Sequence, residues 1–165
     1  MNIEHIKSKI REKVMKWGYT SRPDFIIIGA QKAGTTALFD MLVQHPQLKG
    51  SAKKEIHYFD NDDWYNQQAI ETYHNHFPLP HHLPKGTLCF EATPKYLFHP
   101  KVAKRLYQYN SKLKLIVVLR NPVKRAFSAW KMYYYFFKHE GLTDYYDSRS
   151  FEDAIQEELS DKHQS

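Results

Sequence analysis

The chain has 165 residues, a net charge of +6 and a single cysteine, Cys89. This length suits one domain with a real core and is short for two full domains. One cysteine excludes an internal disulfide framework and fits a reducing compartment, and so small a positive excess does not by itself indicate nucleic acid.

The first 22 residues predict an amphipathic helix that precedes the main domain. Its apolar residues recur at helical spacing with basic residues between them: Ile3, Ile6, Ile10, Val14 and Trp17. The region lacks the apolar core of a signal peptide, and no stretch of the chain reaches the roughly 20 apolar residues that span a bilayer. We therefore expect a helix packed on the domain, with a membrane-surface helix as the alternative, no transmembrane segment and a cytoplasmic protein.

A strand, a loop and a helix follow. Phe25–Ile28 is a continuous apolar run typical of a strand buried on both faces, and Thr35–His45 predicts a helix that Pro46 ends. The intervening loop reads GAQKAGTT, with two glycines five residues apart. Backbone N–H groups in such a loop, together with the positive end of the helix, favour a bound anion.

The position of the lysine in this loop separates two kinds of phosphate site. In nucleotide triphosphatases the lysine directly precedes the hydroxyl residue that binds magnesium. Here Thr35 stands at the lysine position and Lys32 comes three residues earlier. The loop therefore predicts phosphate binding but not ATP hydrolysis.

The segment KKEIHYFD, Lys53 to Asp60, brings a carboxylate and an imidazole together. Glu55 and His57 alternate onto one side of an extended segment, where they could take a proton from an acceptor hydroxyl. On these residues alone, a surface charge cluster is the more common explanation.

The stretch from residue 60 to residue 84 loses any periodic pattern and predicts an irregular, solvated insertion. Four histidines lie in it: His74, His76, His81 and His82. No carboxylate or cysteine accompanies them at a familiar ligand spacing, so we do not expect a metal site.

Further alternating elements predict an α/β fold with a parallel sheet. Thr87–Phe90 predicts a strand that Pro94 ends, Lys101–Tyr109 a short helix, and Leu113–Leu119 the clearest strand in the chain. Cys89 lies in an apolar run and is expected to be buried. Ligands of such sheets bind beyond the carboxyl ends of the strands.

The segment LRNPVKRAFS supplies a second anion site. The strand ends at Arg120, and Asn121 and Pro122 are typical of a helix start. We expect aromatic residues to form the buried face of this helix, with Ser128 on its polar face. An arginine and a hydroxyl can grip a phosphate, whereas a triphosphatase ends such a strand with an acidic residue for magnesium.

These two segments resemble the sulfotransferases that use 3'-phosphoadenosine 5'-phosphosulfate (PAPS), through the loop and the R-x(7)-S motif. The resemblance runs from about Asp24 to Leu142 and more weakly over Phe151–Leu159. It implies a P-loop-NTPase-like three-layer fold with a central parallel sheet, and a sulfotransferase domain over residues 23–165 that lacks its C-terminal portion. It also implies the residues that bind the donor: Lys32, Ala33, Gly34, Thr35, Thr36, Arg120 and Ser128.

The segment KKEIHYFD resembles the K-E-x-H-[FY]-F motif of the heparan-sulfate-type branch of this family. That likeness implies Glu55 as general base, with Lys32 and His57 also in the catalytic set. Lys54 and Asp60 would support acceptor binding. EATPKY resembles the segment that borders the acceptor cleft, which implies acceptor contacts for Glu91, Thr93 and Tyr96; Ala92 replaces a basic residue of several carbohydrate-modifying members.

The resemblance therefore implies transfer of a sulfuryl group from PAPS to an acceptor hydroxyl. A carbohydrate acceptor is favoured, with a lipid, polyketide or other small molecule as other choices. Adenosine 3',5'-bisphosphate is the expected product, and neither metal nor nucleic acid is expected to take part. The alternatives are a P-loop kinase or triphosphatase, and a nucleotide-binding fragment that is catalytically incomplete.

Overall fold

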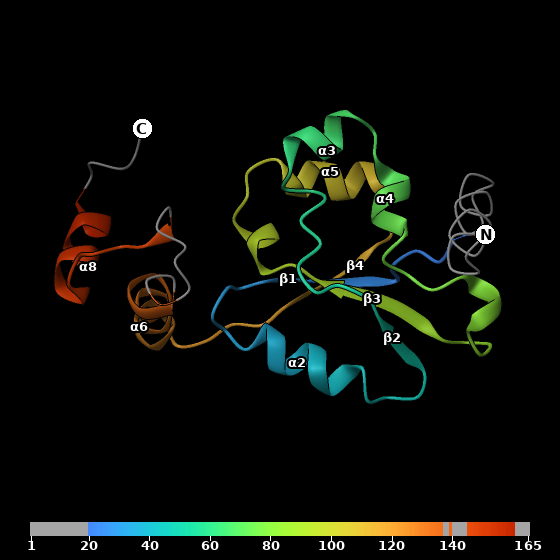
Figure 1. The fold of residues 1–165 in the computed structure, drawn as a ribbon, viewed down its shortest axis with the longest axis horizontal. Coiled ribbons are helices and arrows are strands. Elements are labelled where there is room, and N and C mark those ends of the chain that lie inside the picture. Colours follow the sequence, from blue (N-terminus) through green and yellow to red (C-terminus); the bar gives the residue numbers. More distant parts are fainter. Residues whose placement is uncertain (1–19, 137–138, 140–144, 161–165) are drawn as a thin grey trace, which may run out of the picture. The chain divides into compact units, whose positions relative to one another are not determined.

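The computed structural model describes residues 20–136, 139 and 145–160. The chain forms two compact units, one of residues 20–30 and 34–119 and one of residues 31–33 and those from 120 onward. The relative positions of the units are not determined, so each is described by itself (Figure 1). The helix predicted for residues 1–22 lies almost entirely outside the described residues.

The first unit is built on a four-stranded sheet in the order β2-β3-β1-β4. All neighbouring strands are parallel, as predicted. The strands are β1 (Phe25–Gly29), β2 (Leu48–Gly50), β3 (Leu88–Ala92) and β4 (Lys114–Val117). Since β1 pairs with a strand on each edge, its backbone is satisfied on both sides, which suits its continuous run of apolar residues.

Helices cover both faces of this sheet, as Figure 1 shows: α2 (Thr35–Leu42) lies on one face and α5 (Val102–Tyr109) on the other. Side chains of β1 alternate between the faces. Phe25 and Ile27 pack in a cluster with Leu38, Phe39 and Leu42 of α2, whereas Ile26 packs in a cluster with Val102 and Leu106 of α5. These two apolar layers confirm the three-layer α/β architecture.

The stretch over residues 60–84 was expected to be irregular and solvated, and this prediction was wrong. It forms α3 (Asp62–Asn66), α4 (Ile70–His74) and the 3-10 turn η1 (Pro80–His82), and it buries Tyr73 and Phe77 completely. Asn61 caps α3 by accepting a hydrogen bond from the Trp64 amide at 2.9 Å. Five-residue helices are too short to repeat an apolar pattern, which is why no periodicity signals them.

One of the four histidines also belongs to this core. His74 is buried, its Nε2 lies 2.9 Å from the Tyr109 hydroxyl, and burial with the nearby charge of Arg22 lowers its pKa to about 4. His81 and His82 are exposed and touch each other. In the described part of the chain, no three His, Cys, Asp or Glu side chains gather as metal ligands.

Strand boundaries differ from the predicted ones by a few residues. β3 continues through Glu91 and Ala92 because Ile26 and Ile27 of β1 pair with them in register. Cys89 is buried within β3, as expected. The three-residue strand β2 was not predicted; register with β3, and a hydrogen bond of 2.9 Å from the Leu88 amide to the Gln47 carbonyl, define it rather than local propensity.

The second unit contains α6 (Pro122–Lys131), the π-helical turn η3 (Met132–Phe136) and α8 (Phe151–Leu159). Asn121 and Ser150 cap α6 and α8 with their side chains. The aromatic side of α6 packs within this unit, but no residue of the helix is fully buried there. Phe127 and Trp130 stack on each other and meet Phe151 of α8 edge-on, and Trp130 also stacks on Tyr134 of η3.

Replacing Ile26 in the centre of the sheet should destabilise the protein strongly. Ile26 is fully buried, so Ile26→Ala should cost about 2–5 kcal/mol of unfolding free energy through lost burial and a cavity. Its matched control is Leu115→Ala, because Leu115 pairs with Ile26 in register but is 47% exposed; there we expect about 1 kcal/mol or less. Urea titration followed by circular dichroism measures both, and equal losses would contradict this account of the core.

Candidate active site

The candidate site of the first unit lies at the carboxyl edge of the sheet. The segment that follows β2 runs along the end of β3, since the Ser51 amide donates to the Phe90 carbonyl at 2.8 Å and the Glu55 amide to the Ala92 carbonyl at 2.9 Å. Glu55 therefore lies beside Ala92, the last residue of β3. This is the edge at which parallel sheets bind ligands.

Four ionisable side chains of this segment form one row of contacts. His57 Nδ1 lies 2.8 Å from Asp60 Oδ2, and its Nε2 lies 3.6 Å from Glu55 Oε2. Lys54 Nζ donates to Glu55 Oε1 at 2.8 Å. Glu55 and His57 both have left-handed backbones, each with φ 59°, instead of the extended conformation expected from the sequence. Such conformations are unfavourable for residues other than glycine and cluster at functional sites.

These contacts keep both His57 and Glu55 charged at neutral pH. Hydrogen bonding to Asp60, with Glu55 second, raises the pKa of His57 to about 9. The imidazolium of His57, at ion-pair rather than hydrogen-bond distance, together with the ammonium of Lys54 lowers the pKa of Glu55 to about 2 against the effect of partial burial. His57 is thus a cation and not a proton acceptor, while Glu55 is an ionised carboxylate. The geometry favours Glu55 as the proton acceptor of this segment.

The start of α2 has the features of an anion site. Gly34 precedes the helix with φ 105°, a left-handed conformation that favours glycine, and no side chain caps the first turn. Thr35 is buried and Thr36 is exposed. The uncapped N–H groups, the positive helix end and the Thr36 hydroxyl can all bind a phosphate oxygen.

In the second unit, the structure brings together Lys32, Arg120 and Ser128. Arg120 Nη1 donates to the Lys32 carbonyl at 3.1 Å, and Ala33 follows in the same short segment. Lys32 and Ser128 line a cavity of about 630 Å³, whose lining is Lys32, Ser128, Lys131, Met132, Tyr135 and His139. Two ammonium groups and a hydroxyl on one cavity suit an anionic ligand.

Lys131 and Tyr135 of this cavity were not among the predicted site residues. Lys131 lies three residues after Ser128, a spacing that shares one helix face and could have indicated it. Its ammonium also lies 4.8 Å from the centre of the Phe127 ring. No signal pointed to Tyr135, because it lies in the π-helical turn, which shifts side chains off the α-helical pattern.

Glu91, Thr93 and Tyr96 were expected to contact an acceptor, but all three side chains are buried. The Tyr73 hydroxyl donates to Glu91 Oε1 at 2.9 Å and the Thr93 hydroxyl donates to Glu91 Oε2 at 2.8 Å. Burial raises the pKa of Glu91 to about 7, and these hydrogen bonds act in the opposite direction. Their burial argues against direct acceptor contacts. Asp60 is likewise buried, with 2% of its side chain exposed, whereas Lys54 keeps 21%.

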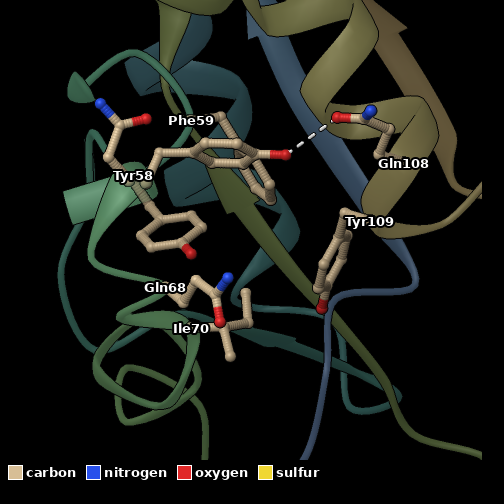
Figure 2. Close-up of a pocket in the computed structure, with 8 residues that line it drawn as sticks. Tyr58, Phe59, Gln68, Ile70, Gln108 and Tyr109 are labelled. Carbon is tan, nitrogen blue, oxygen red and sulfur yellow. Dashed lines mark hydrogen bonds between the residues drawn. The ribbon is translucent and has the colours of Figure 1, made fainter. Parts of the chain in front are cut away.

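A second cavity lies on the sheet face covered by α3, α4 and α5, and Figure 2 shows it. It measures about 430 Å³, and its lining is Tyr58, Phe59, Tyr65, Asn66, Gln68, Ile70, Gln108 and Tyr109. The Tyr65 hydroxyl donates to Gln108 Oε1 at 3.1 Å across it (Figure 2). Arg105 lies 4.4 Å from the centre of the Tyr65 ring and donates to the Phe59 carbonyl at 2.8 Å. Phe59, next to the ionisable row, is therefore held firmly in the core.

Comparison with known proteins identifies similar sequences. The family model described as "Sulfotransferase domain" matches residues 22–163. "Membrane-associated sulfotransferase kil1" of Dictyostelium discoideum is 43% identical over 108 residues, which cover 66% of this chain and 22% of that protein. "Heparan sulfate glucosamine 3-O-sulfotransferase 5" of Homo sapiens is 40% identical over 106 residues, which cover 64% of this chain and 29% of that protein. The chain thus spans less than a third of the length of either relative.

A solved structure extends the comparison to three dimensions. A sulfotransferase from Alicyclobacillus acidocaldarius matches with a TM-score of 0.57 and 30% identity, over 87% of this chain and 58% of that chain. Together with the parallel sheet, this match confirms the predicted P-loop-like fold. Among the residues described, no helix is long and apolar enough to cross a membrane. The cytoplasmic location expected from the sequence stays a prediction.

The charge of His57 should depend mainly on Asp60. In Asp60→Asn we expect the pKa of His57 to fall from about 9 towards its ordinary value of 6.5, because Asp60 contributes the largest effect. Glu55→Gln should lower it less. NMR titration of the imidazole resonances, assigned with His57→Gln, measures both changes. Since a raised histidine pKa stabilises the fold below about pH 6.5 and that gain disappears as the pH rises through about 9, Asp60→Asn should flatten this part of the stability profile. A His57 pKa that stays near 9 in Asp60→Asn would contradict the assignment.

Proposed function

Because the chain belongs to the sulfotransferase domain family, we propose that it forms part of an enzyme that transfers a sulfuryl group from PAPS to an acceptor hydroxyl, with a carbohydrate as the favoured acceptor. The observation that carries this proposal is the row Lys54, Glu55, His57 and Asp60 at the carboxyl edge of the sheet. It offers an ionised carboxylate, held between two cations, in the segment that follows β2.

The chain offers two sets of groups for the donor. Gly34, Thr35 and Thr36 at the start of α2 would bind the 5'-phosphosulfate through backbone N–H groups and a hydroxyl. Arg120 and Ser128 would bind the 3'-phosphate through charge-assisted hydrogen bonds. PAPS, as the second substrate, supplies an activated sulfuryl group with a phosphate as its leaving group. Lys32, with Ala33 beside it, would neutralise the charge that develops on that phosphate.

Glu55 would remove the proton from the acceptor hydroxyl. Its pKa of about 2 makes it a weak base while His57 and Lys54 both contact it. Base strength would rise if the acceptor hydroxyl replaced one of these two cations beside the carboxylate, since each lowers the pKa of Glu55. His57, held by Asp60, would then keep the carboxylate oriented and stabilise the charge without exchanging a proton itself.

A carbohydrate acceptor is supported by similarity and by the chemistry of the row. The human relative named above acts, by its name, on a glucosamine of heparan sulfate. Lys54, with part of its side chain exposed, would attract an anionic sugar. Ala92, where several carbohydrate-modifying relatives have a basic residue, is fully buried at the end of β3, so any basic contact to a sugar would come from elsewhere in the protein.

Calorimetry with adenosine 3',5'-bisphosphate tests the donor site. We expect this nucleotide to bind without metal and ATP–magnesium to bind far more weakly. Arg120→Ala should weaken binding roughly 10- to 100-fold, the effect of losing hydrogen bonds to a charged group. Lys124→Ala is the matched control, because Lys124 is an exposed cation four residues after Arg120 and does not line the cavity, and there we expect less than about a twofold change. Tight binding of ATP–magnesium alone would instead favour a kinase or triphosphatase.

The role of Glu55 is tested by Glu55→Gln. This change keeps the size of the side chain but removes the proton acceptor, so sulfate transfer from radiolabelled PAPS to desulfated heparan sulfate should fall about 10²- to 10⁴-fold. Binding of adenosine 3',5'-bisphosphate should change little. Glu71→Gln, on the exposed side of α4, serves as the control with unchanged activity. A fully active Glu55→Gln enzyme would disprove the assignment of the base.

A further inference from the structure

The segment that carries Glu55 and His57 is hydrogen-bonded to one buried hydroxyl group, that of Tyr96. The hydroxyl oxygen of Tyr96 accepts hydrogen bonds from the Tyr58 amide at 3.1 Å and from the Phe59 amide at 3.3 Å. These are the two backbone N–H groups that lie between His57 and Asp60 in the sequence. One atom thus ties down the turn across which the imidazole meets its carboxylate.

The backbone here needs such a partner from outside the strands. The left-handed conformations of Glu55 and His57 interrupt the pairing of the segment after β2 with the end of β3, so the amides that follow bond to other partners. A buried N–H without an acceptor costs about 1–3 kcal/mol. Side chains take over instead: Tyr96 accepts from the amides of Tyr58 and Phe59, and Arg105 donates to the Phe59 carbonyl.

Tyr96 itself lies among buried polar side chains. Its oxygen accepts two hydrogen bonds, which leaves the hydroxyl proton to donate. Glu91, fully buried and bonded to Tyr73 and Thr93, is the nearby buried carboxyl. Burial raises the pKa of the Tyr96 hydroxyl most, and the charge of Glu91 raises it further. Tyr96 and Glu91 therefore belong to one buried polar cluster at the end of β3.

We propose that Tyr96 is a positioning residue for the transfer reaction: its hydroxyl holds the turn from His57 to Asp60 and thereby keeps His57 beside Glu55. Its side chain is buried, and its hydroxyl is bonded to the backbone amides of Tyr58 and Phe59. The catalytic consequence depends on the function proposed above. The positioning itself does not, because it is measured on the protein without substrate.

The test compares Tyr96→Phe with Tyr109→Phe. Both changes remove one hydroxyl from the same aromatic core, but the Tyr109 hydroxyl bonds to His74 and not to the segment. In Tyr96→Phe the pKa of His57, followed by NMR titration, should fall from about 9 towards 6.5 by about one pH unit or more, because the turn that presents His57 to Asp60 is released. In Tyr109→Phe it should stay near 9. A folded Tyr96→Phe protein with an unchanged His57 titration overturns the proposal.

Kinetics separate positioning from general loss of stability. Tyr96→Phe should lower kcat at least about tenfold while KM for PAPS changes less than about twofold, since the donor-binding groups do not depend on this hydroxyl. Equal losses in the two tyrosine variants would argue for a structural role only. If no sulfate transfer is found in the wild-type protein while the His57 titration responds as expected, the proposed function fails and the positioning role stands.

If Tyr96→Phe does not fold, hydrogen exchange of the Tyr58 and Phe59 amides in the wild-type protein tests the same contacts. The amides of Tyr58 and Phe59 should exchange as slowly as the Glu55 amide, which bonds to the Ala92 carbonyl of β3. Exchange of both amides at the rate of a solvent-exposed peptide would show that the Tyr96 hydroxyl does not hold them, and would overturn the proposal.

Discussion

The pairing of β1 with a strand on each edge is the constraint on which the rest of the first unit depends. It places β1 in the middle of the sheet, where α2 and α5 bury its apolar side chains on the two faces, and it brings the ends of β1, β2 and β3 to one edge. Each of these ends leads into a functional segment: the phosphate loop, the row with Glu55, and the turn that contains Tyr96. None of these segments forms a strand or a long helix, so their positions depend on hydrogen bonds to the sheet that they leave.

Within that frame, electrostatics decides the roles of the ionisable side chains. A glutamate beside a histidine suggests two possible bases, but the contacts here distinguish them. Asp60 fixes a proton on His57, and the resulting cation keeps a negative charge on Glu55. A buried carboxyl group without such partners behaves in the opposite way, as Glu91 does with its pKa of about 7. Two glutamates of one unit are thus separated by their surroundings into an ionised group and a group near its titration point.

The parts of the fold and of the site that follow long apolar runs, helix caps or glycine loops could be predicted from the sequence. The apolar run of β1, the helix start after Gly34 and the cap at Asn121 were visible because each follows from local sterics and hydrogen bonding. The short helices α3 and α4 were not, since five residues carry no period. The burial of Glu91, Thr93 and Tyr96 was also missed, because polar residues at a strand end look like cleft residues until the partners that satisfy them, such as Tyr73, are known.

The left-handed backbone at Glu55 and His57 has a consequence for how this segment can change in evolution or in the laboratory. A branched side chain such as valine or threonine fits that conformation poorly, whereas asparagine, aspartate and glycine tolerate it. Two separate requirements therefore limit the side chains at these positions: the left-handed backbone and the chemistry of the reaction. The conformation of these two residues, and not only their chemistry, thus limits which side chains the segment accepts.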